Sequence, residues 1–180
     1  MLEDLLAEDL PLVVCGSAAG RRSAQLKQYY AGPGNKFWRT LARTGLTPRL
    51  LSPPEWRELL AFGIGLTDLV KRQSGGDREI DFGRAGRREL ERKLARLRPQ
   101  ILCFNGKRAA SEYFGRRHVE FGEQTQRIAD TRIFVAPSTS GAANGAWDPA
   151  LWDELAARVR ALPSGRAARA RRASAHTSAV

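Results

Sequence analysis

The chain has 180 residues, a length that suggests one domain. It has 30 Lys or Arg against 19 Asp or Glu, and its formal net charge of +11 favours an anionic partner, most commonly nucleic acid. Its two cysteines lie in separate apolar runs, which excludes a disulfide framework and the spacing of a zinc site. No apolar run reaches membrane-spanning length and the acidic start MLEDLLAEDL lacks a basic leader, so we expect a cytoplasmic protein with no membrane partner.

The first half of the chain alternates between helical and extended patterns. Residues 2–9 have the spacing of a short helix, and the buried strand PLVVCG then ends at Gly16. A loop over residues 16–25 separates this strand from a helix in GNKFWRTLARTG. The next helix, SPPEWRELLAFG, has Ser52 as its N-cap and prolines in its first turn, and it leads into a second strand at residues 64–70.

The second half repeats this alternation. GRAGRRELERKLARLRP is a long amphipathic helix, and QILCFNG is a third strand that leads into the helix KRAASEYFG. The segment around Gly122 is predicted as a loop. TRIFVA is a fourth strand, followed by a polar loop and a closing helix capped by Asp148. Residues 1–163 are therefore predicted as one domain, and residues 164–180 as a disordered basic tail that either adds phosphate contacts or is simply solvated.

Strands that alternate with helices predict an α/β fold, here a three-layer αβα sandwich around a central, mostly parallel four-stranded sheet. In such sheets, ligands bind in the crevice beyond the carboxyl ends of the strands. That rule selects four loops as the candidate site, and all four carry the unusual residues of the chain. They are residues 16–25, 67–73, 104–107 and 136–146.

Four motifs in these regions carry a resemblance to a known family. YAGPGNKFW, GIGLTDLV, FGRAGRRELERKLARLRPQILCFNGKRA and APSTSG are similar, in order and spacing, to the thymine-DNA and mismatch-specific branch of the uracil-DNA glycosylase superfamily. The similarity runs from about Val13 to about Leu162. FNGK and PSTS also resemble the hypoxanthine-DNA glycosylases of the same superfamily. The resemblance implies a monomer that flips a deaminated base out of DNA and hydrolyses its N-glycosidic bond without metal or organic cofactor, releasing free uracil and leaving an abasic site.

The base-binding residues are carried over from this resemblance. Tyr30 stands where relatives stack an aromatic ring on the extruded base, with a core tyrosine as the alternative, and Asn35 helps to shape the pocket. Relatives carry an asparagine at the position of Ala18, and its amide positions the attacking water. Alanine cannot hydrogen-bond a water through its side chain, but the backbone N–H groups from Ser17 to Gly20 can still hold an oxygen of the base.

Three residues are candidates for the missing water-positioning role. Asp68 stands where many relatives place an asparagine that reads the base edge. An ionised aspartate only accepts hydrogen bonds, so it either holds the N3–H of uracil or orients a water. Thr67 matches a threonine that supports the water in relatives. Asn105 offers an amide from the third strand, or caps the helix that follows.

The remaining candidates would contact the DNA backbone. Small hydroxyl side chains in residues 138–141 fit close to a phosphate, although an ordinary turn without a ligand is the alternative. Relatives next insert a side chain into the gap left by the base, and here only Ala142, Ala143 and Asn144 are available, which favours lesions that are already unstacked. The predicted phosphate contacts are Arg21, Arg22, Ser23, Lys71, Arg72, Lys107, Ser138, Thr139, Ser140 and Gly141.

The sequence therefore predicts a monofunctional glycosylase that removes uracil from double- or single-stranded DNA. Two alternatives stay open. One is a preference for hypoxanthine or another deaminated base. The other is a protein that binds lesions or abasic sites and cleaves poorly, because Ala18 replaces the catalytic amide.

Overall fold

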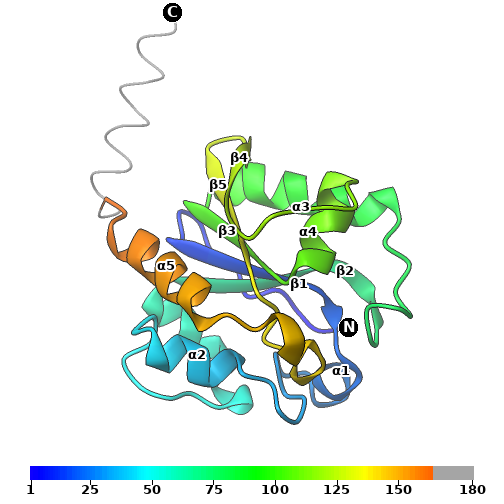
Figure 1. Cartoon of the computed structure of the whole chain (residues 1–180), viewed down its shortest axis with the longest axis horizontal. Coiled ribbons are helices and arrows are strands. Elements are labelled where there is room, and N and C mark those ends of the chain that lie inside the picture. The colour runs from blue at the N-terminus through cyan, green and yellow to red at the C-terminus, as the bar shows by residue number, and fades with distance from the viewer. Residues whose placement is uncertain (164–180) are drawn as a thin grey trace, which may run out of the picture.

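The computed structural model describes residues 1–163, apart from the side chains of Asn144 and Ala146. The predicted basic tail, residues 164–180, lies outside this part. Residues 1–163 form an α/β fold around one sheet of strand order β2-β1-β3-β5-β4, in which only β4 runs antiparallel to its neighbour (Figure 1). The strands are β1 Leu12–Ala19, β2 Ile64–Ser74, β3 Ile101–Asn105, β4 Gly122–Ile128 and β5 Thr131–Ala136.

The described sheet has five strands, so the predicted number of four is wrong. The additional strand is β4, which pairs with β5 in the region predicted as a loop around Gly122. Its sequence is GEQTQRI, and its five central residues are polar and alternate between exposed and half-buried positions. A strand of this kind lacks the apolar run by which buried parallel strands are recognised.

Helices cover both faces of the sheet, as the alternating pattern predicted (Figure 1). Successive residues of a strand point to opposite faces, so Leu12 and Val14 of β1 pack into one core while Val13 and Cys15 pack into the other. The first core is closed by α2 Phe37–Arg43, the 3-10 helix η1 Pro53–Phe62 and α5 Pro149–Arg160. The second is closed by α3 Arg84–Leu97 and α4 Lys107–Phe114.

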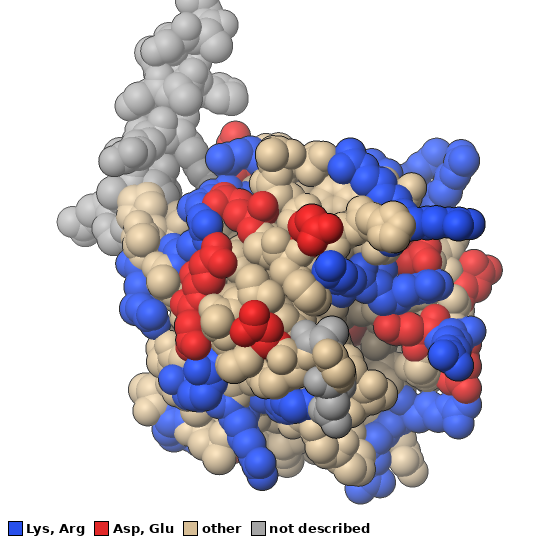
Figure 2. Space-filling view, viewed as in Figure 1, with Lys and Arg blue, Asp and Glu red and all other residues tan. Residues whose placement is uncertain are grey.

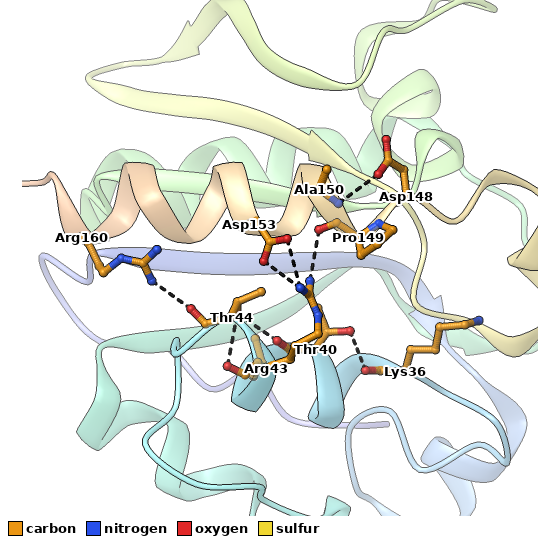
Figure 3. Close-up of polar contacts among 10 residues, drawn as sticks. Lys36, Thr40, Arg43, Thr44, Asp148, Pro149, Ala150, Asp153 and Arg160 are labelled. Carbon is orange, nitrogen blue, oxygen red and sulfur yellow. Dashed lines mark hydrogen bonds and ion pairs between the residues drawn. The ribbon is translucent and has the colours of Figure 1, made fainter.

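Polar contacts join α2 to α5 on the first face (Figure 3). Arg43 donates to both carboxylate oxygens of Asp153, at 2.8 and 3.0 Å, and to the Pro149 carbonyl at 3.1 Å. Arg160 donates to the Thr44 carbonyl at 2.9 Å. The predicted cap of α5 is confirmed, since Asp148 Oδ1 accepts from the Ala150 N–H at 2.9 Å.

Two helical predictions differ from the structure. The segment that begins at Ser52 does start with a capping box, in which Glu55 accepts from the Ser52 N–H at 2.8 Å, but it winds as a 3-10 helix. Residues 2–9 are not helical. Leu5 instead makes an antiparallel bridge to Leu66, with N–H to carbonyl distances of 2.9 and 2.8 Å, and so covers the open edge of β2. No helix among the described residues is long and apolar enough to cross a membrane.

Candidate active site

A cleft of about 570 Å³ opens at the carboxyl ends of the parallel strands, which is within the range of roughly 300–1,000 Å³ of small-molecule sites. It lies at the predicted edge of the sheet, but residues 16–19 and 67–73, predicted as loops, belong to β1 and β2, which continue to Ala19 and Ser74. Pairing between β1 and β3 ends at Cys15 and Phe104, so the last residues of β1, which still pair with β2, border the cleft on the side where β3 has ended. Lys and Arg gather toward the right of Figure 2, where α3 and α4 lie, interspersed with acidic side chains.

Asp68 forms part of the floor of this cleft. It lies on β2 in register with Gly16 on β1, and it is 5% exposed. A Cβ added to Gly16 would stand 2.9 Å from Asp68 Oδ1 and 3.8 Å from the hydroxyl oxygen of Tyr30. This glycine, which lies within β1, therefore makes room for the carboxylate of Asp68, and the hydroxyl of Tyr30 lies beside the same position.

Tyr30 borders the same space with its hydroxyl. The residue has a left-handed backbone, with φ of 53°, and its ring stacks on Phe37 at a centroid distance of 3.8 Å and an interplanar angle of 27°. The hydroxyl is buried with no hydrogen-bond partner among the described residues, although Asn105 lies next to it. Burial, and then the charge of Asp68, raise the pKa of this phenol well above its usual value, so it stays protonated and available as a donor.

Lys71 is the counter-ion of Asp68 and not the DNA contact that the sequence predicted. Its Nζ lies 3.1 Å from Asp68 Oδ2, 2.9 Å from Asp4 Oδ1 and 3.0 Å from the Tyr29 hydroxyl oxygen, and its side chain is 9% exposed. Burial raises the pKa of the Asp68 carboxyl above its usual value, while the charge and hydrogen bond of Lys71 oppose that rise.

The two other catalytic candidates point elsewhere. Thr67 is fully buried, does not line the cleft, and donates to Asp4 Oδ1 at 2.8 Å, so the prediction that it supports a water in the cleft is wrong. Asn105 does line the cleft, but its amide is paired with Thr139. Its Nδ2 donates to Thr139 Oγ1 and its Oδ1 accepts from the Thr139 N–H, both at 2.9 Å. Asn105 thus holds the loop after β5 instead of capping α4.

Parts of the predicted DNA-binding surface are also structural. Thr139 is 0% exposed, so the prediction that its hydroxyl reaches a phosphate is wrong. Ser23 is buried in α1 Arg21–Leu26, a helix within the predicted loop 16–25, and its Oγ accepts from the Ala31 N–H at 3.0 Å. It therefore braces the segment that leads to Tyr30.

Several residues that were predicted to contact DNA lie on the exposed rim of the cleft. Arg22 is exposed there, Arg21 pairs with Glu79, and the Lys107 side chain is 41% exposed. Arg72 is exposed but does not line the cleft. The other predicted residues on the cleft lining are Ser17, Ala18, Gly20, Asn35, Ser138, Ser140, Gly141 and Ala142.

The loop after β5 was predicted either to contact a phosphate or to form an ordinary turn, and its hydrogen bonds are compatible with both. The hydroxyl oxygens of Ser138 and Ser140 each accept a backbone N–H bond two residues on, at 3.3 Å, which is an ordinary turn feature and leaves each hydroxyl hydrogen free to donate outward. Gly141 packs on the Gly-Pro-Gly turn, since a Cβ there would lie 3.3 Å from the Gly34 carbonyl oxygen. The side chain of Asn144, the third candidate for the inserted residue, is outside the described part.

Sequence reasoning missed Asp4, Tyr29 and Lys93. Asp4 accepts from Lys71 and Thr67 with one oxygen, and its other oxygen lies 2.7 Å from Lys93 Nζ. The only signal was a carboxylate placed between apolar Leu2 and Leu5, and the same spacing also fits a helix. Among residues 1–163, no group of three or more His, Cys, Asp or Glu side chains is placed to hold a metal ion.

Comparison with known proteins bears on the family and the fold. The sequence profile of the Uracil DNA glycosylase superfamily matches residues 3–158. The fold is similar to the solution NMR structure of a "putative Uracil DNA glycosylase" from Methanosarcina acetivorans, with a TM-score of 0.60 and 24% sequence identity. That match covers 88% of this chain and 94% of the other. At this identity the structural similarity concerns the fold.

Proposed function

The chain belongs to the uracil DNA glycosylase superfamily, and from that premise we propose that it excises uracil from DNA by hydrolysis, with Asp68 as the group that activates water. Superfamily membership supports a DNA glycosylase function with DNA as substrate, but leaves the excised base open. The observation that carries the proposal is the floor of the cleft, where a buried carboxylate and a buried phenol face the same space across Gly16.

The chemistry needs a base and a negative charge near the sugar. As the N-glycosidic bond breaks, positive charge develops on the sugar and negative charge on the departing base. While it is ionised, the Asp68 carboxylate can stabilise the positive sugar and accept a hydrogen bond from water, and it can take the proton of that water as the water oxygen bonds to the sugar. A carboxyl pKa that burial raises makes a stronger base than an ordinary exposed aspartate.

The departing base requires donors, and two kinds border the cleft. The Tyr30 hydroxyl is a protonated donor with no partner among the described residues. The end of β1, from Ser17 to Gly20, lines the cleft beyond the point where β3 stops. The Tyr30 hydroxyl and the backbone N–H groups from Ser17 to Gly20 can each hold an oxygen of uracil. Catalysis in this proposal therefore does not require the side-chain amide that relatives carry at the position of Ala18.

The substrate is tested with labelled oligonucleotides that carry uracil, hypoxanthine or a T·G mismatch, in duplex and single-stranded form, followed by alkali to break abasic sites. We expect breaks at uracil. Breaks at hypoxanthine alone would replace uracil with that base as substrate. Tight retention of abasic DNA with no breaks at any base would identify a binding protein instead.

The role of Asp68 is tested by Asp68→Asn, which keeps the shape and removes the base. We expect kcat to fall by about 10²–10⁴-fold, with binding of uracil-containing DNA retained. Ala18→Asn is the complementary variant, since the restored amide lies on the same cleft and should raise the rate. An unchanged kcat in Asp68→Asn would remove Asp68 from the mechanism.

A further inference from the structure

The N-terminal segment is built into the floor of the cleft. Its Leu2 and Leu5 are buried in the same core as β1 and β2, and the backbone bridge between Leu5 and Leu66 fixes the segment along the edge of β2. Leu2 also lines the cleft. This anchoring places Asp4 beside the charged side chains of β2, where a freely moving terminus would not hold it.

Asp4 and Asp68 share one buried lysine. Lys71 Nζ lies 2.9 Å from Asp4 Oδ1 and 3.1 Å from Asp68 Oδ2, so the ammonium group bridges the two carboxylates. Behind Asp4, Lys93 of α3 lies 2.7 Å from Asp4 Oδ2 and 2.7 Å from Glu89 Oε1. The result is a row of alternating charges that leads from the surface of α3 to the cleft.

Resting on the function proposed above, we propose that Asp4 is a positioning residue of the active site. Asp4 shares the ammonium group of Lys71 with Asp68 and holds that group in place. Asp68 is therefore not paired with the full charge of Lys71 and can still accept a proton from water. A lysine paired with Asp68 alone would stabilise the ionised carboxylate more strongly and weaken it as a proton acceptor. A buried carboxylate with no lysine would instead remain protonated.

The groups around Asp68 support this division of charge. It is faced by Lys71 on its own strand, by Cys15 on β1, by Tyr29 and Tyr30 after α1, and by Asp4 from the N-terminal segment. Burial raises the pKa of the thiol and of both phenols, so these three groups are neutral near pH 7.

The charges that act on Asp68 are therefore those of Lys71 and Asp4. Burial is the largest cause of the raised pKa of Asp68; Lys71 opposes it and the negative charge of Asp4 adds to it. Burial also acts to raise the pKa of Asp4, but the charge of Lys71 and hydrogen bonds from Lys93, Lys71 and Thr67 outweigh it and lower that pKa. Asp4 therefore remains ionised over the pH range in which Asp68 gains or loses its proton.

Two variants should move the pH dependence of the reaction in opposite directions. In Asp4→Asn the lysine charge acts on Asp68 alone, so the acid limb of kcat/KM should shift to lower pH by roughly 1 unit. In Lys71→Met the carboxylate is buried beside Asp4 with no cation, so that limb should shift to higher pH by at least roughly 1 unit. A purely structural role would lower the rate without separating the two profiles.

The matched control is Glu3→Gln, in the same segment, because the Glu3 side chain is 79% exposed and pairs with Arg57 at the surface. It should leave the profile unchanged. Single-turnover excision of uracil is measured from pH 5 to 9 for the full chain and each variant. An acid limb of Asp4→Asn that stays in place, or moves in the same direction as that of Lys71→Met, would overturn the proposal.

A second measurement separates this proposal from the proposed function. The ¹³C carboxyl resonance of Asp68 is titrated by NMR in the full chain and in Asp4→Asn, with no DNA present. A lower pKa of Asp68 in the variant supports the role of Asp4 even if no uracil is excised, whereas an unchanged pKa refutes it even if excision is rapid.

Discussion

The pair formed by Asn105 and Thr139 provides the sharpest test of how the cleft is built. Two hydrogen bonds of 2.9 Å join the end of β3 to the loop after β5, between residues that are 8% and 0% exposed. Asn105→Ala removes both bonds and leaves the Thr139 N–H and hydroxyl without partners. At about 1–3 kcal/mol for each buried group left unsatisfied, the unfolding free energy should fall by about 2–6 kcal/mol.

Two substitutions at Thr139 calibrate that loss. Thr139→Val is nearly isosteric and removes only the hydroxyl, so it should cost about 1–3 kcal/mol. Thr139→Ser keeps both bonds and loses one methyl group, which is worth about 0.8 kcal/mol. Urea unfolding followed by tryptophan fluorescence measures all three variants. A loss below about 1 kcal/mol in Asn105→Ala would refute the reasoning, since two buried groups would then have found other partners.

The same variants separate two roles of Asn105 in excision. If it acts by holding the loop, Thr139→Val should reduce the excision rate as well, because one of the two bonds is lost. If the Asn105 amide itself guides the water, Thr139→Val should retain most of the rate while Asn105→Ala abolishes it. The two bonds that the Asn105 amide makes to Thr139 favour the first result.

Three further predictions concern other parts of the fold. Gly16→Ala should cost about 1–3 kcal/mol by overpacking, because the new Cβ would stand 2.9 Å from the carboxylate on the cleft floor, whereas Gly20→Ala, with nothing within 4 Å, should leave the melting temperature unchanged. Arg43→Ala should lower the unfolding free energy by at most about 1 kcal/mol, and by less in 1 M salt, because its ion pair with α5 is exposed. Hydrogen bonds from Ser52, then an ion pair, lower the pKa of Glu55 to about 2 from 4.5. Its contribution to stability is therefore present above pH 4.5 and lost as the pH falls toward 2, and Glu55→Gln should flatten the unfolding curve over that window. An equally steep curve in the variant would contradict this.

The N-terminal segment shows why some elements escaped prediction. Leu2 and Leu5 have a spacing that fits one face of a helix, but Leu5 pairs with Leu66, more than sixty residues away. A strand-like bridge of this kind depends on a partner that local periodicity does not contain. The same is true of β4, whose polar residues form a strand because β5 offers a free edge.

The amino-acid sequence by itself determined the alternation of strands and helices and the edge of the sheet where the cleft opens, because apolar runs bounded by glycine and proline make parallel strands whose carboxyl ends meet. The same rule selected Asp68, and the family resemblance added Tyr30; both line the cleft. Only the tertiary structure decided which neighbouring side chains share that space. Thr67 and Lys71 lie close to Asp68 in the chain, yet one is turned away and the other is buried between two carboxylates. Side-chain direction and burial are set by strand pairing and by contacts with Asp4, and those partners are brought together only when the chain folds.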